Sequence, residues 1–204
     1  MSAEWVEREH DEEDFDGAVL DEATLRACRF TRCSFRGADL AHAVTEHCVF
    51  DDCDFTGARL NGSAHEGTAF LNCRFRGARL FGAEFRECKL TGSSFAEANL
   101  DAARIRGGDW SFAALAQQDL RGQNLRRVRF ADADLAGCNL EKADLREADL
   151  ARATLRGARL AGADLRGANV EGIDFAGLAL RGTRLDLAQA VAVVRCLGAR
   201  VEFE

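Results

Sequence analysis

Residues 143–170 read ADLREADLARATLRGARLAGADLRGANV, with a large apolar residue at every fifth position. A period of five fits neither an amphipathic helix, whose period is 3.6, nor a half-buried strand, whose period is 2. The same spacing extends outward from Phe15 to Leu185 without an insertion or deletion, and of its 35 positions only Thr45 and His65 are not apolar. A repeat this regular predicts a solenoid, in which each coil contacts only its neighbours.

Two further positions of the repeat are restricted. Two residues before each central apolar residue, 29 of the 34 sites between Ala18 and Thr183 hold Ala, Cys, Ser, Thr or Gly. We expect both side chains to point into a narrow interior, where the small one makes room. The exceptions are Gln118, Gln123, Val128, Ile173 and Leu178. Two residues after the central residue lie 17 of the 19 glycines, which predicts a recurring turn with positive φ or close backbone approach.

Residues 105–124 are the least regular part of the repeat. They hold two large polar residues at small positions, and Trp110 is oversized for a central position. Gly108, two residues before that tryptophan, has no side chain and so leaves space in the interior. Because the spacing is unchanged on both sides, we expect a local bulge or bend within the coil rather than a loop.

The repeat A-(D/N)-L-x-x in residues 143–170 resembles that of the pentapeptide-repeat family, and the resemblance covers residues 15–185. It implies an all-β fold, a right-handed quadrilateral β-helix in which four pentapeptides make one square coil of 20 residues. With that period, two interior ladders of phenylalanine are expected, one of Phe15, Phe35, Phe55, Phe75 and Phe95 and one of Phe30, Phe50 and Phe70. The β-helix is predicted to span residues 15–185.

The two ends depart from the repeat. Residues 1–14 carry seven carboxylates against Arg8, which is typical of a solvated cap or frayed tail. In residues 186–204, Asp186 suits a helix N-cap, Gly198 suits the position after the helix, and Ala199 to Phe203 is interpreted as a short strand. An apolar helix at the end of a solenoid must cap its own coil or pair with a second copy. We expect a homodimer whose interface holds Leu187, Ala190, Val191, Val194, Leu197, Val201 and Phe203.

The segment GTRLDLAQAVAVVRCLGARVEFE, which starts at Gly182, resembles the C-terminal module of the quinolone-resistance members of the family, of the Qnr type and the mycobacterial type. That resemblance implies a rod-shaped dimer that binds DNA gyrase or topoisomerase IV as a mimic of duplex DNA. The Qnr type has loops that project from its coils. The unbroken spacing from 15 to 185 predicts no such loop, which makes the chain more similar to the mycobacterial type.

Charge tests the mimic hypothesis. Residues 15–185 hold 24 acidic and 24 basic residues, whereas duplex DNA as long as about nine coils, about 42 Å, would carry roughly 25 negative charges. Mimicry therefore requires that charge be segregated by side. The acidic positions expected to stand in for phosphates are Asp134, Asp144, Asp149, Asp164 and Asp174. A basic column is expected on one side, formed by Arg86, Arg106, Arg126, Arg146 and Arg166. The alternative is a solvated surface on which arginines and aspartates of adjacent columns neutralise one another.

The cysteines and the histidine that could otherwise indicate a catalytic or metal site fall at interior positions of the repeat. Seven of the eight cysteines occupy small interior positions at multiples of five, which predicts reduced core thiols rather than disulfides or a C-x2-C metal site. Thr45 and His65 are 20 residues apart, so a buried hydroxyl–imidazole hydrogen bond is expected. We find no nucleophile–base set, paired carboxylates or phosphate-cradling glycine loop, and expect neither an enzyme nor a cofactor.

Three hypotheses for function follow. The first is a topoisomerase-binding protein that shields its target from a drug or toxin. The second is a structural or scaffolding solenoid with an unrelated protein partner. Direct nucleic-acid binding is disfavoured by the sequence pI of about 5.2 and by the lack of exposed aromatics among the basic residues. Without a signal-like N-terminus or 18 consecutive apolar residues, we expect a cytoplasmic protein with no membrane contact.

Overall fold

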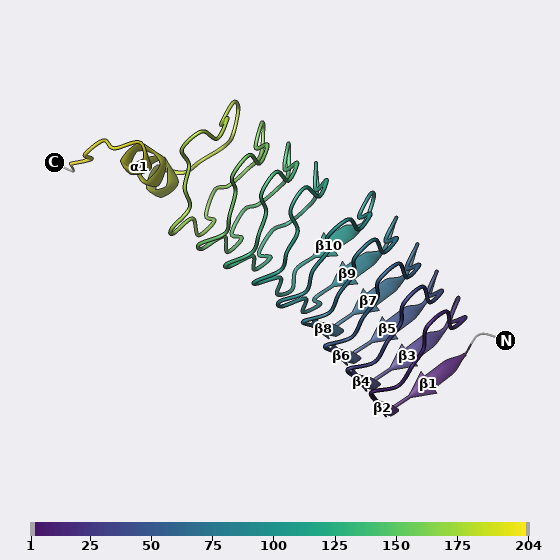
Figure 1. Ribbon diagram of the computed structural model, residues 1–204. Coiled ribbons are helices and arrows are strands. Elements are labelled where there is room, and N and C mark those ends of the chain that lie inside the picture. The colour runs from purple at the N-terminus through teal and green to yellow at the C-terminus, as the bar shows by residue number, and fades with distance from the viewer. Residues whose placement is uncertain (1–2, 203–204) are drawn as a thin grey trace.

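A stack of coils that repeat every 20 residues builds the protein, with the two ends of the chain at opposite ends of the stack (Figure 1). The computed structural model describes residues 3–202. The strands are β1 (Glu4–Val6), β2 (Glu9–Asp11), β3 (Thr24–Arg26), β4 (Arg29–Thr31), β5 (Val44–Glu46), β6 (Val49–Asp51), β7 (Ala64–Glu66), β8 (Ala69–Leu71), β9 (Glu84–Arg86) and β10 (Arg104–Arg106). They form two parallel sheets, ordered β1-β3-β5-β7-β9-β10 and β2-β4-β6-β8. The predicted all-β quadrilateral β-helix is confirmed.

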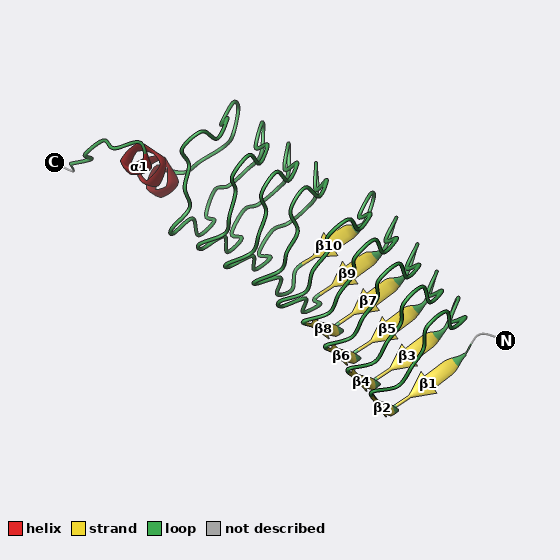
Figure 2. Cartoon of the chain, viewed as in Figure 1, coloured by secondary structure: helices red, strands yellow, loops and turns green. Residues whose placement is uncertain are grey.

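The strands lie in the N-terminal half of the stack, and the C-terminal half consists mostly of turns (Figure 2). The later coils are still paired, by single-residue parallel bridges such as Asp144 with Asp164. Turns recur at every fifth residue, and all 17 glycines at the predicted offset have a positive φ, between 56° and 76°. Glycine is frequent there because a Cβ atom makes this backbone conformation costly.

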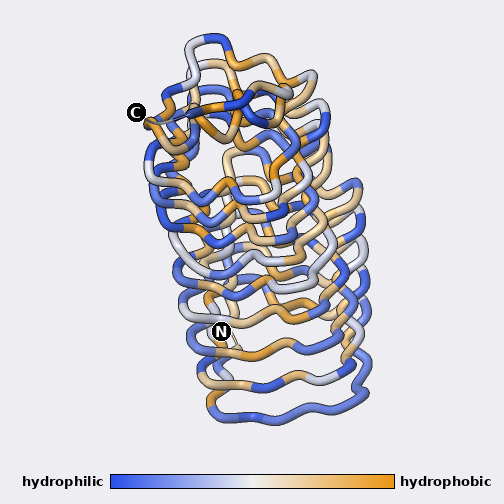
Figure 3. The backbone as a smooth tube through the Cα atoms, turned by 90° about the vertical axis from the view of Figure 1, so that its left-hand side faces the viewer, coloured by the Kyte–Doolittle hydropathy of each residue, from blue (hydrophilic) through white to orange (hydrophobic). Residues whose placement is uncertain are grey.

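The core is a narrow column of central and small side chains. Phe35 and Phe55 stack at 4.9 Å with ring planes 5° apart, and Phe30 and Phe50 stack at 4.7 Å, so both predicted ladders are present. Hydrophilic and apolar stretches alternate within the coils (Figure 3). Because each coil buries its own set of side chains against the next, stability is distributed along the stack.

The first coil begins earlier than the expected boundary at residue 15. Strands β1 and β2 pair with β3 and β4, which places Trp5 and His10 at central positions. His10 stacks on Phe30 with ring centroids 5.0 Å apart. Glu7 and Glu12 also donate backbone hydrogen bonds to the second coil. The acidic segment is therefore part of the β-helix rather than a separate tail; the polar side chain at position 10 concealed the repeat.

The helix α1 (Leu187–Cys196) follows the last coil. Asp186 is its N-cap, as predicted, and forms a capping box with Gln189, while Gly198 has a φ of +89° just beyond the helix. The expected strand from Ala199 is wrong for residues 199–202, which have no strand partner. A strand needs a neighbouring edge, and here the helix separates this segment from the coils. Phe203 lies outside the described residues.

The backbone ladder between coils is interrupted in two places. Within residues 3–202, no backbone hydrogen bond joins 97–107 to 116–127, and none joins 153–160 to 173–180. Gln118 and Gln123 lie in the first gap, and Ile173 and Leu178 in the second. These are four of the five large residues at small positions, and each follows an alanine 20 residues earlier. The predicted bulge is thus a separation of coils, caused by side chains too large for the interior.

Val128, the fifth exception, leaves the ladder intact because Gly108 lies one coil below it. A Cβ atom on Gly108 would lie 2.1 Å from the Cys88 carbonyl oxygen, so only glycine allows that approach. The Arg129 amide still donates to the Gly108 carbonyl oxygen at 3.1 Å. An oversized residue therefore opens the stack only where no smaller residue compensates beneath it.

Candidate partner-binding surfaces

The five predicted acidic positions do not share one side of the stack. Asp144 and Asp164 lie on the side of the stack that begins with β1, whereas Asp149 lies on the side that begins with β2. Asp134 lies above Ala114 and Ser94 on a third side, and Asp174 has the same place in the repeat. They cannot form a single column.

Asp144 and Asp164 are neutralised by the arginine column. Arg146 donates two hydrogen bonds to Asp144, at 2.8 and 2.6 Å, and Arg166 does the same for Asp164, at 2.8 and 2.7 Å. The neighbouring guanidinium holds the pKa of Asp164 at about 2 and lowers that of Asp144. The side chain of Asp164 is only 12% exposed. These two carboxylates stabilise their own surface and offer little charge to a partner.

Acidic charge gathers instead along one corner of the stack, between the sides that begin with β2 and with Phe15. This acidic ridge comprises residues 11–14 and their equivalents at intervals of 20. It holds 11 carboxylates: Asp11, Glu12, Glu13, Asp14, Asp51, Asp52, Asp54, Asp132, Asp134, Glu171 and Asp174. Only three basic residues share it, Arg32, Arg74 and Arg152. The rest of the β-helix is close to charge balance, so the protein concentrates its negative charge here.

The ridge arginines are bound to nearby carboxylates. Arg32 contacts Asp11 and Glu12, and Arg152 contacts Asp132 at 2.7 Å. Within the described part of the chain, six ridge carboxylates have no basic partner: Asp14, Asp51, Asp54, Asp134, Glu171 and Asp174. Asp134 and Asp174 were predicted from the sequence, and the other ridge residues were missed. Applying the period of 20 to charges from residue 4 onward would have found them.

The terminal helix divides its faces between the last coil and solvent. Gln189 donates to the Leu165 and Ala168 carbonyl oxygens, and Val193 packs against the core. Of the predicted interface residues, Leu187, Val194 and Leu197 are 75%, 41% and 66% exposed. Ala190, Val191 and Val201 are half-buried. The helix thus caps its own coil while leaving an apolar strip free.

The buried Thr45–His65 pair and the interior thiols form hydrogen bonds within the core. Thr45 Oγ1 lies 2.7 Å from His65 Nδ1, which confirms the predicted pair, and Ser63 Oγ lies 2.9 Å from His65 Nε2. Burial lowers the pKa of His65 to about 3 and raises that of Cys88 to about 12. The interior thiols donate to carbonyl oxygens of the coil below, as Cys138 does to Leu115. These groups hold the core together.

Within residues 3–202, the structure shows no group of three or more His, Cys, Asp or Glu side chains that could hold a metal ion. It also shows in that range no helix with the length and apolarity to cross a bilayer.

Family models match most of the coils. The model described as pentapeptide repeat region matches residues 23–100, and the model described as pentapeptide repeats (8 copies) matches 111–146, 124–160 and 153–189. The chain belongs to the pentapeptide-repeat family. No curated protein of similar sequence was found.

Solved structures of pentapeptide-repeat proteins have the same fold. A trypsin-treated variant of QnrB1, a plasmid-mediated fluoroquinolone resistance protein, matches with a TM-score of 0.85 and 24% identity, over 98% of this chain and 100% of that one. Full-length QnrB1 matches with a TM-score of 0.79 and 24% identity, over 94% and 100%. HetL from Nostoc sp. strain PCC 7120, a protein involved in heterocyst differentiation regulation, matches with a TM-score of 0.51 and 25% identity, over 89% and 86%.

Proposed function

We propose that this protein is a non-enzymatic DNA mimic that binds DNA gyrase or a related type II topoisomerase and protects it from a drug or toxin. The observation that carries the proposal is the acidic ridge on a rod whose fold matches QnrB1 from end to end. A DNA-binding enzyme attracts duplex DNA by its phosphates. A rigid row of unpaired carboxylates offers the same charge to the same basic surface.

The spacing of the ridge supports this role. Its carboxylates gather on coils that are two apart near the N-terminus, at 11–14 and 51–54, and again near the C-terminus, at 132–134 and 171–174. Coils stack about 4.8 Å apart, so the two groups of each pair lie about 10 Å apart, roughly the distance over which salt screens charge. The two pairs are four coils apart, since no ridge carboxylate lies between Asp54 and Asp132. The ridge therefore presents two negative patches, one toward each end of the rod, rather than one point charge.

A homodimer would double the length of the rod. The exposed strip of Leu187, Val194 and Leu197 lies at the C-terminal end of the stack, where a two-fold axis would join two copies end to end. This exposed apolar strip supports the proposed dimer. A two-fold symmetric dimer would in turn be able to contact both halves of a symmetric enzyme. We further propose that the protein acts in the cytoplasm, where its target works.

Inhibition of DNA supercoiling by purified gyrase tests the proposal. We expect the parent protein to inhibit, and a variant with Asp51→Asn, Asp54→Asn, Asp134→Asn and Asp174→Asn to inhibit at least tenfold less well. Its residual inhibition should be less sensitive to salt. Asparagine keeps the turn bonds that several of these carboxylates accept, such as that from the Ala136 amide to Asp134, so the fold should be unchanged.

A matched control is Asp39→Asn with Asp119→Asn, since both residues occupy the equivalent acidic position on another side of the stack. This control should inhibit as the parent does. Equal inhibition by the ridge variant and the parent would reject the mimic. No inhibition by the parent at any ratio would favour a scaffolding role with an unrelated partner.

A further inference from the structure

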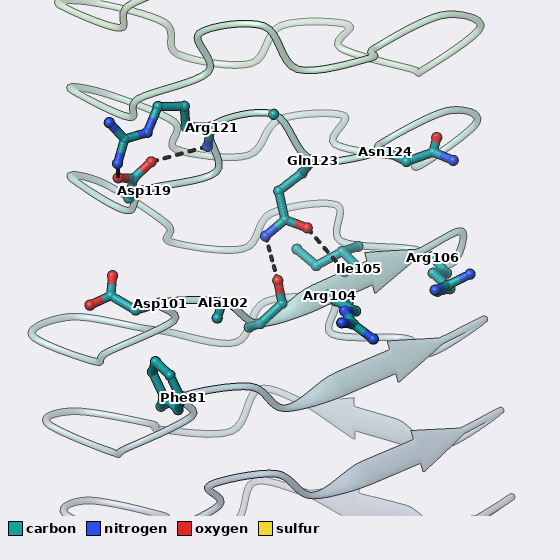
Figure 4. A pocket seen from close by; sticks show the side chains of 12 residues that line it. Phe81, Asp101, Ala102, Arg104, Ile105, Arg106, Asp119, Arg121, Gln123 and Asn124 are labelled. Atoms are coloured by element: carbon teal, nitrogen blue, oxygen red, sulfur yellow. Dashed lines mark hydrogen bonds and ion pairs between the residues drawn. The ribbon is translucent and has the colours of Figure 1, made fainter.

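The first gap between coils is an open groove. It has a volume of about 720 Å³ and is lined by residues 101–106 on one edge and 119, 121–124 on the other, with Phe81 at its mouth. Figure 4 shows the Gln123 side chain reaching across the opening toward the Ala103 carbonyl and Ile105. We call this feature, between residues 97–107 and 116–127, the inter-coil groove.

The side-chain amide of Gln123 makes hydrogen bonds that a backbone amide of the neighbouring coil makes where the coils are closed. In the closed coil below, the Arg104 amide donates to the Ala83 carbonyl oxygen, and the equivalent donor one coil later would be the Asn124 amide, to Ala103. Instead, Gln123 Nε2 donates to the Ala103 carbonyl oxygen, and Gln123 Oε1 accepts from the Ile105 amide at 3.5 Å. A side-chain amide therefore occupies the place of one peptide group of an additional strand.

The two edges of the groove lack the backbone hydrogen bonds that join other neighbouring coils. The repeat pattern calls for ladder bonds from the amides of Glu97, Leu100, Ala102, Gly107, Asp119 and Asn124, and none of them is formed within residues 3–202. Donors and acceptors thus face each other across the groove without meeting. A chain that offers N–H and C=O groups on both of its sides, an extended peptide, satisfies two such edges at once.

Charge and shape restrict what kind of peptide fits. Arg104 lies on the lower edge and has no carboxylate partner among the described residues, whereas Asp119 on the upper edge is bound by Arg121 at 2.8 Å. Arg106 and Arg126 flank the same side of the stack but are bound by Glu84 and Glu147, each at 2.9 Å. Asp101, a lining carboxylate that no described basic residue binds, lies at the Phe81 end, away from Arg104 (Figure 4). Phe81, 58% exposed, offers an apolar contact at the mouth. The surroundings favour a peptide with a carboxylate facing Arg104 and an apolar side chain at the Phe81 end.

We propose that the inter-coil groove binds an extended acidic segment of a partner protein, which displaces the Gln123 amide and adds as a strand between β10 and residues 122–126. The strand's main chain would pair with both edges, its acidic side chains would face Arg104, and an apolar side chain would cover Phe81. This surface is separate from the acidic ridge, and the inference does not depend on a topoisomerase as the target.

The test uses the full-length protein and a mixture of capped octapeptides with Glu at alternate positions and Val, Thr or Phe between them. We expect binding by fluorescence anisotropy, and slower hydrogen exchange at the Gly107 and Asn124 amides when peptide is added. The same peptides with alternate amides N-methylated should bind at least tenfold more weakly, because they lack half of the main-chain donors. Lysine in place of glutamate should weaken binding to a similar degree.

Variants of the protein separate groove binding from nonspecific attraction. Gln118→Ala with Gln123→Ala restores small residues at both interior positions, so the coils should close and peptide binding should fall at least tenfold. Gln117→Ala, which removes an amide from the outer turn of the same coil, is the control and should bind as the parent does. Arg104→Ala should weaken binding several-fold, and Arg79→Ala, an exposed arginine on an intact coil, should not.

Hydrogen exchange of the free double variant reports whether the coils have closed. Unchanged binding by a closed variant would overturn the proposal. So would a variant whose groove stays open, because the glutamines would then not be the cause of the opening. Equal binding of the N-methylated peptides, or no binding of the octapeptide mixture, would also overturn it.

Discussion

Replacing both glutamines of the inter-coil groove with alanine should stabilise the protein. Alanine occupies the equivalent interior positions of closed coils, for example Ala143 in the column of Gln123 and Ala78 in that of Gln118. Closure would form seven ladder bonds, the six now absent and the one from the Ile105 amide. It would remove three side-chain bonds, two of Gln123 and the one from Gln118 to the Phe95 carbonyl oxygen.

The magnitude follows from the difference in hydrogen bonds. At roughly 0.5–1.5 kcal/mol net for each additional bond, closure should raise the free energy of unfolding by about 2–6 kcal/mol. If the coils stayed apart, the variant would lose the three side-chain hydrogen bonds without forming the ladder, at a cost of roughly 1.5–4.5 kcal/mol. The two outcomes therefore differ in sign, which makes the measurement decisive.

Urea unfolding followed by circular dichroism measures the change, and hydrogen exchange at the Ala102 and Asn124 amides shows whether the ladder has formed. We expect a higher midpoint together with new protection at both amides. A lower midpoint, or a higher one without protection, would refute the account of the gap as a wedge held open by oversized side chains.

Three other predictions concern the core and the terminal helix. Because burial lowers the pKa of His65 from about 6.5 to about 3, the stability that its neutral form contributes above pH 6.5 is lost as pH falls toward 3, by about 1.4 kcal/mol per pH unit; urea titrations should show that His65→Phe removes this dependence. Leu145→Asp buries a charge in a fully enclosed column and should cost several kcal/mol, whereas exposed Arg156→Ala should cost under about 0.5 kcal/mol; equal losses of Tm would contradict the interior assignment. Leu187→Glu with Leu197→Glu should yield a folded monomer in light scattering, and a parent that is already monomeric at micromolar concentration would contradict the dimer.

Much of the fold follows from the spacing of residues in the sequence. A strict period of five fixed which side chains enter the core, and grouping by 20 correctly paired Phe35 with Phe55 and Thr45 with His65. The helix N-cap was predictable because Asp186 and Gln189 form a local motif. These features depend on interactions that recur in every coil or lie within one turn.

The remaining features depend on what lies in the neighbouring coil. In the sequence, Gln123 and Val128 both stand out as residues too large for a small interior position. Whether the stack opens depends on the residue one coil below. Below Val128 that residue is Gly108, which leaves room for the valine, so the ladder stays intact. Asp144 was assigned to a partner surface although the column of Arg146 was recognised beside it, because the spacing of the sequence does not show whether two neighbouring columns pair; in the structure Arg146 binds Asp144. The start of the β-helix was placed too late because His10 interrupts the apolar pattern while its strand still pairs with β4.

The most direct test of the proposed function is competition between this protein and linear duplex DNA for purified DNA gyrase. If the acidic ridge occupies the surface that holds DNA, immobilised gyrase should bind the protein, saturating duplex should displace it, and the ridge variant should bind at least tenfold more weakly. Simultaneous binding of protein and duplex to the same enzyme, or no binding of the parent protein, would contradict the mimic.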